Sequence, residues 1–174
     1  MPVTIIATVS SASANSYVTL AEADAYFATR LYATDFTSLS DDDRSRALIM
    51  ATERIDQELY YGVKTDGNQA LKWPRTGVPI PGESGSFYSA GLVNYYLATA
   101  IPSVVKLAQY EYALLISGTD ILAQSDLGNY KRVKVGPIEV EMNQPVASGI
   151  ISAEVARLLN GIRLGSSGAA IVRS

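Results

Sequence analysis

The chain has 174 residues, of which 48% are hydrophobic and 18% charged, with a formal net charge of -3. It is long enough for one globular domain with a real core, because a domain of about 150 residues buries roughly 70% of its unfolded surface. The absence of cysteine excludes disulfides and thiolate chemistry, and the absence of histidine removes the commonest general base and metal ligand. These absences favour a structural protein over an enzyme. We expect such a protein to bind no cofactor and no metal.

The acidic balance argues against a dedicated nucleic-acid binder, whose binding face is usually strongly basic. Residues 1–12 lack the basic residues that open a signal peptide. No apolar run reaches the roughly 18 residues of a membrane span. We therefore expect a chain that is neither exported nor inserted in a membrane.

A capping box predicts the first helix. Thr19 and Glu22 are spaced so that each side chain can accept a hydrogen bond from a free backbone amide of the first helical turn. A helix is therefore expected from Leu20 to about Tyr32. Its apolar residues recur at helical spacing and form one stripe: Leu20, Ala23, Phe27 and Leu31.

A second capping signature, Ser40 with Asp43, predicts a long helix that ends at about Tyr60, before Gly62. The three aspartates at 41–43 place negative charge at the positive end of the helix dipole. We therefore interpret them as capping residues rather than as ligands of a hard cation. The apolar stripe of this helix consists of Leu48, Ala51, Ile55 and Leu59.

The stretch from Gly62 to Ala100 has no regular period, because glycines and prolines are too frequent in it for long elements. We expect a long irregular loop with one embedded turn of helix at 92–98. Loops of this length are uncommon in compact domains unless they bind something or become ordered against a neighbour. Trp73 is interpreted as the residue that anchors this loop, either to the core or to a partner.

Two further helices are predicted in the second half of the chain. Pro102 fits a first helical position and Gly118 a stop, and the residues between them are apolar on nearly every side. Such a helix is expected at the centre of the fold or between subunits. A last helix, capped by Ser148 or Ser152, is expected to end at Gly161. Its apolar stripe is Ile151, Val155, Leu158, Leu159 and Ile162.

Residues 130–142 predict a β-hairpin around Gly136 and Pro137, because apolar residues alternate with basic ones before the turn and with acidic ones after it. The charged residues of this hairpin are Lys131, Arg132, Lys134, Glu139 and Glu141. A basic strand then opposes an acidic one, and cross-strand charge pairs fix the register at roughly a few tenths of a kcal/mol each. An isolated hairpin is only marginally stable and must pack on something.

Together these elements predict a mainly α fold: a small bundle of about four helices with one β-hairpin and a long irregular loop. We expect a single domain at residues 1–165. Residues 166–174 are too short and too rich in glycine and serine to fold alone, so they form either a disordered tail or a docking arm.

A second interpretation of the hairpin is a surface for single-stranded nucleic acid, in which aromatic rings stack on bases and cations bind phosphates. Its residues are Tyr130, Lys131, Arg132 and Lys134, with Tyr60, Tyr61 and Trp73 from elsewhere in the chain. The facing glutamates neutralise the basic strand, which favours a structural hairpin. An enzyme that works with carboxylates or tyrosines is a third interpretation, and it requires buried titratable residues gathered in one pocket.

Four stretches carry a resemblance to a known family. They are SYVTLAEADAYFATRLYA at 16–33, QALKWPRTGV at 69–78, IPSVVKLAQYEYALLI at 101–116 and YKRVKVGPIEVEM at 130–142. Together they resemble the head-tail adaptor, or head-completion, proteins of tailed bacteriophages. Many relatives in that family carry the label DnaT-like single-stranded DNA-binding protein. The likeness spans most of the chain in the right order, and none of the stretches is a catalytic signature.

The resemblance implies a structural virion protein at the head-tail interface, assembled in the host cytoplasm and without enzymatic activity, cofactor or membrane contact. Such subunits form a ring, commonly a dodecamer, that binds the portal protein and the tail or tail-completion proteins. DNA passes through their channel without sequence-specific binding. The alternative function is a small single-stranded DNA-binding module that uses the aromatic and basic surface described above.

The resemblance also implies where such a subunit makes its contacts. In these adaptors the C-terminal segment often reaches into the portal. The matching residues here are Gly168, Ala169, Ala170, Ile171, Val172, Arg173 and Ser174. Long loops usually touch a neighbouring subunit or the next tail protein, and the residues expected to do so here are Trp73, Arg75, Phe87 and Tyr88.

Overall fold

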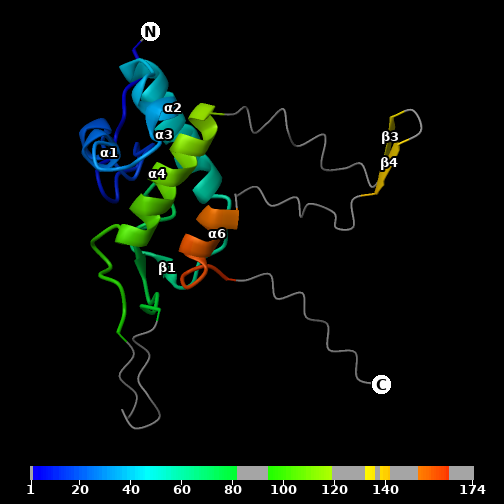
Figure 1. The fold of residues 1–174 in the computed structure, drawn as a ribbon. Helices are drawn as coiled ribbons and strands as arrows, with labels where there is room; N and C mark the ends of the chain where they lie inside the picture. Colours follow the sequence, from blue (N-terminus) through cyan, green and yellow to red (C-terminus); the bar gives the residue numbers. More distant parts are fainter. Residues whose placement is uncertain (1, 82–93, 119–131, 136–137, 142–152, 165–174) are drawn as a thin grey trace, which may run out of the picture.

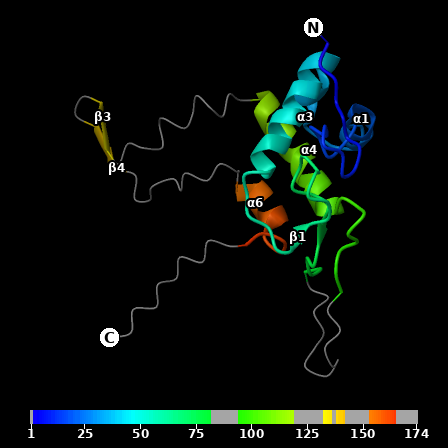
Figure 2. The same ribbon diagram turned by 180° about the vertical axis from the view of Figure 1, so that it is seen from behind.

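The computed structural model describes residues 2–81, 94–118, 132–135, 138–141 and 153–164. The fold class is mainly α with one β-hairpin, as predicted. The helices among these residues are α1 (Leu20–Phe27), α2 (Thr34–Thr37), α3 (Asp41–Ile55), α4 (Ser103–Gly118) and α6 (Ala153–Leu159). Helix α4 lies at the centre of the bundle, because α2, α3 and α6 all pack against it, while α1 packs against α3 (Figures 1 and 2).

Helix α1 begins where it was predicted to begin and ends earlier. The Thr19 hydroxyl accepts from the Glu22 amide at 3.2 Å, and the Glu22 carboxylate accepts from the Thr19 amide at 2.8 Å, which completes the capping box. The predicted end near Tyr32 is wrong, because Arg30 reaches across to α4 and Tyr32 adopts a positive φ of 57°. Leu31 therefore leaves the apolar stripe and is 75% exposed.

Helix α3 is capped by Ser40, whose hydroxyl accepts from the Asp43 amide at 3.2 Å. It ends at its C-cap residue Asp56 rather than at Tyr60. The predicted stripe is buried as far as the helix extends, at Leu48, Ala51 and Ile55. Leu59 follows the end of the helix and is 65% exposed, so its place in the stripe was wrong.

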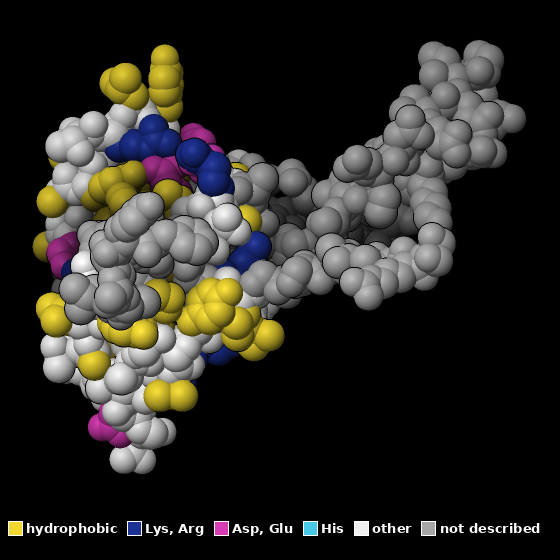
Figure 3. All heavy atoms as spheres, turned by 90° about the horizontal axis from the view of Figure 1, so that it is seen from below, with side chains coloured by type: hydrophobic (Ala, Val, Ile, Leu, Met, Phe, Trp, Pro, Cys, Tyr) yellow, Lys and Arg dark blue, Asp and Glu magenta, His cyan; other side chains and the backbone are white. Residues whose placement is uncertain are grey.

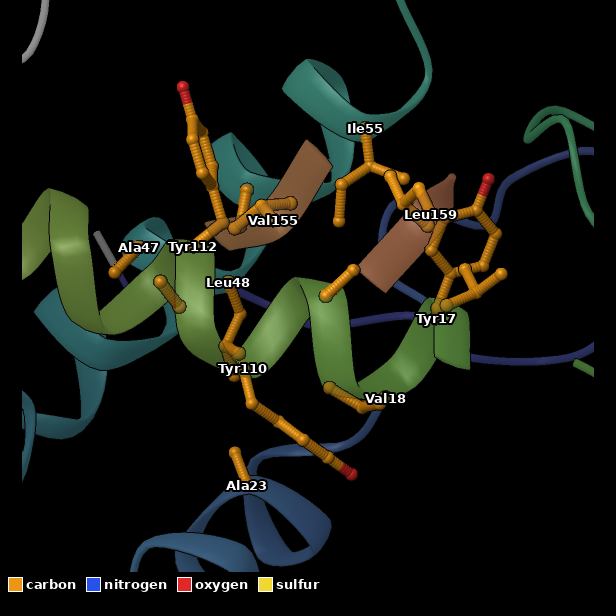
Figure 4. Packing of buried hydrophobic residues seen from close by; sticks show 14 of the residues in the cluster. Tyr17, Val18, Ala23, Ala47, Leu48, Ile55, Tyr110, Tyr112, Val155 and Leu159 are labelled. Carbon is orange, nitrogen blue, oxygen red and sulfur yellow. The ribbon is translucent and has the colours of Figure 1, made fainter. Parts of the chain in front are cut away.

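Helix α4 confirms both its predicted limits and its central position. Figure 4 shows labelled core residues from three other helices around it: Ala23 of α1, Leu48 of α3 and Val155 of α6. Gln109, one of the few polar residues of this helix, is fully buried. Its side-chain amide donates to the Ser16 hydroxyl at 2.7 Å and to the Leu48 carbonyl at 3.0 Å. A buried polar side chain is tolerated here because its hydrogen bonds are made.

The described parts of the predicted loop form a folded layer. Strand β1 (Val63–Lys64) pairs antiparallel with β2 (Arg75–Thr76), and Val78 is fully buried. Residues 94–96 run beside 78–80, with Ile80 donating to Asn94 at 2.8 Å and Tyr96 donating to Val78 at 3.0 Å. The helical turn predicted at 92–98 is therefore wrong for 94–98, because this backbone pairs with another segment instead of with itself.

Helix α6 closes the bundle and brings the end of the described chain back to the loop layer. Val155, Leu159 and Ile162 are buried, as predicted. Just beyond the helix, Arg163 forms an antiparallel bridge with Tyr60. The candidate caps of this helix, at 148 and 152, and the start of its stripe at 151 lie outside the described residues.

The predicted hairpin consists of β3 (Arg132–Val135) and β4 (Ile138–Glu141). The two strands are antiparallel, with Arg132 opposite Glu141 and Lys134 opposite Glu139. The predicted opposition of a basic strand and an acidic strand is therefore confirmed in the register.

Candidate functional site

The described cations of the helical bundle, Arg54 excepted, form ion pairs with carboxylates on the same chain. The ion pairs are Arg30–Glu111, Arg44–Asp24, Arg44–Asp41, Arg46–Asp43, Lys106–Glu22, Arg157–Glu154 and Arg163–Glu58. In Figure 3 basic and acidic side chains lie next to one another in one region of the underside. Exposed pairs of this kind contribute only about 0–1 kcal/mol each to stability, but they neutralise the surface.

Arg75, predicted as a contact residue, joins the two sides of the loop layer. Its Nε donates to the Tyr61 carbonyl at 2.7 Å and its Nη2 donates to the Gly62 carbonyl at 2.6 Å. The lysines of this layer behave in the same way, with Lys64 Nζ donating to the Gln69 carbonyl at 3.0 Å and Lys72 Nζ donating to the Glu58 carbonyl at 2.7 Å. These cations are held by exposed or half-buried backbone carbonyls, which leaves fewer of their donors for an external phosphate.

The aromatic residues of the predicted stacking platform are divided between the core and the surface. Trp73 is 1% exposed and lies edge-on to Tyr60 and Tyr96, with ring centroids 5.4 and 6.5 Å away. Tyr60 is 4% exposed, and its hydroxyl donates to the Ile55 carbonyl. Tyr61 is 41% exposed. Trp73 was expected to anchor the loop either to the core or to a partner, and in the structure it anchors the loop to the core. Its buried indole ring has no exposed face on which a base could stack.

A half-buried polar cluster that the sequence analysis did not predict lies beside Trp73. The Tyr17 hydroxyl donates to Asp56 Oδ1, and the Lys72 amide donates to Asp56 Oδ2 at 2.9 Å. Burial raises the pKa of Asp56, and burial together with the nearby Asp56 charge raises the pKa of Tyr17. No local pattern predicts the contact between Asp56 and Lys72. The sequence analysis placed Asp56 within a helix and Lys72 within an irregular loop.

The adjoining cavity is small. It has a volume of about 10 Å³ and is lined by Tyr17, Trp73, Gln69 and several residues of 7–16. Such a space holds about one water molecule and no substrate. Among the residues that the structure describes, no group of three or more carboxylates gathers as a cation site, and no helix is long and apolar enough to cross a membrane.

The described surface also carries large apolar side chains. Four of them lie on the two segments that are joined by the bridge between Tyr60 and Arg163: Leu59 (65% exposed), Tyr61 (41%), Val63 (67%) and Leu164 (45%). We call these four residues the apolar patch. The Leu164 amide donates to the Leu59 carbonyl at 2.8 Å, which makes these two residues cross-strand neighbours. Figure 3 shows apolar side chains gathered at several places on the underside.

The remaining predicted site residues are only partly placed. Phe87, Tyr88, Lys131 and the whole C-terminal arm at 168–174 lie outside the described residues. The other charged hairpin residues, 132, 134, 139 and 141, are placed through the backbone register alone.

The family model described as "Putative DnaT-like ssDNA binding protein" matches residues 1–174, so the chain belongs to that family. No curated protein and no solved structure matches the chain.

Proposed function

We propose that this member of the DnaT-like family is a structural virion subunit, a head-to-tail adaptor without enzymatic activity. In this proposal copies of the chain form a ring, commonly dodecameric in such adaptors, between the portal protein and the tail proteins. The ring continues the DNA channel at the head-tail interface of the virion and binds no cofactor.

The observation that carries the proposal is the character of the described surface. Its Lys and Arg side chains, with the exception of Arg54, are held by carboxylates or backbone carbonyls, whereas large apolar side chains are exposed. Arg54 acts electrostatically on the Tyr112 hydroxyl. Exposed apolar side chains of this size are typical of surfaces that contact other proteins. Free cations along a groove, which nucleic-acid binding requires, are not a feature of this part of the chain.

The resemblance to phage adaptors supports the same proposal. The stretches at 16–33 and 101–116 supply α1 and α4, and the stretch at 69–78 supplies the Trp73 anchor of the loop layer. The stretch at 130–142 supplies the hairpin. The matching segments thus include the framework of the fold. A mildly acidic subunit also suits a DNA conduit, because strong basic contacts would retain the phosphates.

Light scattering of the purified chain, alone and mixed with a cognate portal ring, tests the proposal. We expect the mass of the portal ring to rise by a multiple of the chain mass. Deletion of residues 166–174 is expected to abolish the rise while leaving the helical circular dichroism unchanged. The absence of a complex with the full chain contradicts the adaptor function.

Single-stranded DNA binding is a second candidate function, and the description of the matching family favours it. On this chain the candidate binding residues are the hairpin cations Lys131, Arg132 and Lys134, with Tyr61 as an exposed aromatic residue. Binding of a labelled oligonucleotide that weakens with salt, and that is lost when these three cations become glutamine, supports this function. Glutamine replacement of Arg46, Arg157 and Arg163 is the matched control for charge.

A further inference from the structure

Two large apolar side chains project from the turn between α1 and α2. They belong to Leu31, which is 75% exposed, and to Tyr32, which is 92% exposed. We call these two residues the apolar knob. The fold holds the chain on both sides of the knob, because Arg30 makes two hydrogen bonds to Glu111 of α4 and Ala33 is buried. The knob is therefore a projection in a fixed position on the bundle.

The backbone of the knob is strained at Tyr32. This residue has a φ of 57°, in the left-handed region that a bulky side chain rarely adopts. The ring is exposed and buries almost no apolar surface within its own chain, so burial does not offset the strain. Strained residues of this kind are concentrated at functional sites, and exposed aromatic residues are the usual anchors of protein–protein contacts. The knob thus has the character of an anchor for another protein surface.

The apolar patch is a surface of matching chemistry elsewhere on the same chain. Its two leucines, Leu59 and Leu164, are cross-strand neighbours, and all four of its side chains are exposed. Helix α2, which follows the knob, lies beside the C-terminal end of α4, where Asp35 approaches Gly118, whereas β1 lies beyond the opposite end of α4 (Figure 1). Since the knob and the patch are both exposed, a chain does not cover its patch with its own knob.

The charges beside the two surfaces have opposite signs. The segment that follows the knob is acidic, since residues 33–50 contain four aspartates and two arginines. The segment that carries most of the patch is basic, since residues 59–81 contain two lysines, one arginine and one aspartate. A contact between two knobs or between two patches would bring like charges together, whereas a contact between a knob and a patch brings opposite charges together. Charge therefore favours a knob from one copy and a patch from another.

We propose that the apolar knob of one copy docks on the apolar patch of a second copy of this chain. The contact is head-to-tail, so each copy gives its knob to one neighbour and its patch to the other, which is the kind of interface that closes a ring. Burial of Tyr32 against the patch supplies the apolar contact that the ring lacks in the single chain. This inference rests on the proposed ring assembly and names the two surfaces that join its subunits.

Two double variants test the contact, because each removes one of its surfaces. The knob variant is Leu31→Ser with Tyr32→Asn, since asparagine tolerates a positive φ and keeps the turn. The patch variant is Leu59→Ser with Val63→Thr, since threonine keeps the strand preference of valine. All four side chains are exposed, so both variants should fold, which circular dichroism verifies. Met50→Gln is the control, because Met50 is a partly exposed apolar residue of α3 outside both surfaces.

Light scattering measures the mass of each chain at concentrations up to about 1 mM. The mass of the unmodified chain and of the Met50→Gln control is expected to rise above that of a monomer. Each double variant alone is expected to associate at least about tenfold more weakly. A mixture of the two variants should give a dimer of one copy of each and nothing larger, because only one intact knob and one intact patch remain in that pair.

Three results overturn the inference. The first is an unmodified chain that stays monomeric at about 1 mM. The second is a mixture of the two variants that forms no dimer. The third is a variant that associates with itself as tightly as the unmodified chain. If that variant is the patch variant and it no longer binds the portal ring, the patch belongs to a contact with the portal protein instead.

The same variants separate this inference from the adaptor function. A portal complex that takes up the knob variant and the patch variant in the same number of copies as the unmodified chain overturns the inference and leaves the adaptor function intact. The absence of a portal complex with the unmodified chain contradicts the adaptor function, whatever the chains do alone.

Discussion

Arg30 and Glu111 are joined by two hydrogen bonds, from Nε to Oε1 at 2.8 Å and from Nη2 to Oε2 at 2.9 Å. This pair ties the turn after α1 to the middle of α4, and the Tyr26 hydroxyl donates to the same carboxylate at 2.5 Å. The Arg30 hydrogen bonds lower the pKa of Glu111. Tyr32, two residues beyond Arg30, is held at a positive φ and is 92% exposed.

Glu111→Gln is expected to destabilise the fold by about 1 kcal/mol near neutral pH, since solvent screens a partly exposed pair. A carboxylate with a lowered pKa contributes stability above its unfolded pKa, and that contribution is lost as pH falls through the folded value. The difference between the two proteins should therefore be present at pH 7 and vanish below the folded pKa of Glu111. Urea unfolding at both pH values measures it, and an equal difference at both contradicts the assignment.

Asp56 should show the opposite pH dependence. Burial raises its pKa, so the folded protein binds this proton more tightly, and stability falls as pH rises from the unfolded value through the folded value. Asp56→Asn is expected to remove that part of the pH dependence. The fold is retained because the asparagine oxygen can accept from the Lys72 amide and the Tyr17 hydroxyl can accept from its NH₂ group.

Asp56→Leu is the contrasting variant at this position. It leaves the Tyr17 hydroxyl and the Lys72 amide without acceptors and should cost about 1–3 kcal/mol per unsatisfied group. Thermal unfolding from pH 3 to 8 distinguishes the variants. A pH dependence in Asp56→Asn equal to that of the unmodified chain would show that Asp56 does not titrate in this way.

Gly62 is required by close approach as well as by its φ of +68°. A Cβ at this position would lie 2.1 Å from the Thr76 carbonyl oxygen, where β1 meets β2. Gly62→Ala should therefore destabilise the fold by about 2 kcal/mol or more. Gly67→Ala is the matched control, because nothing lies within 4 Å of its Cβ, and it should change stability by less than about 1 kcal/mol. Equal effects in chemical unfolding would contradict the geometry.

Gln109 joins the N-terminal segment to α3 and α4. Its Oε1 accepts from the Tyr17 amide at 3.2 Å, and its Nε2 donates to Ser16 and Leu48. Gln109→Leu removes these bonds without removing their partners and should cost about 2–4 kcal/mol. Gln109→Glu keeps the acceptor oxygen but lacks the NH₂ donor, so it should recover little of the stability that Gln109→Leu loses. Denaturant midpoints measure both variants, and a leucine variant as stable as the unmodified chain would show that the network contributes nothing.

The sequence predicted the helices best where a local signal begins a helix. The Thr19 capping box, the Ser40 cap and the Pro102 start each lie where the structure has them, because caps act within one turn. The C-terminal ends of α1 and α3 were placed too late. The apolar residues Leu31 and Leu59 continue the helical spacing, but they serve an exposed turn and the apolar patch instead of the core.

The structure of the loop layer and of the polar clusters could not be predicted from local sequence patterns. Residues 62–81 are ordered through Arg75, through the bridge from Tyr60 to Arg163 and through the pairing of 78–80 with 94–96, all of which join distant positions. The prediction that Trp73 belongs to a base-stacking surface was wrong for the same reason. Tertiary packing decides whether a side chain is buried, and Trp73 is buried in the core. The hairpin register was predictable because charge alternation fixes it locally.

We propose that this chain works through contacts with other proteins rather than with phosphates. The most direct test measures the complex with a cognate portal ring and the binding of a labelled single-stranded oligonucleotide in parallel, at about 0.15 M and about 0.5 M salt. The account predicts a portal complex that persists at the higher salt and no oligonucleotide binding at the lower. Salt-sensitive oligonucleotide binding without a portal complex would contradict it and establish the DNA-binding function instead.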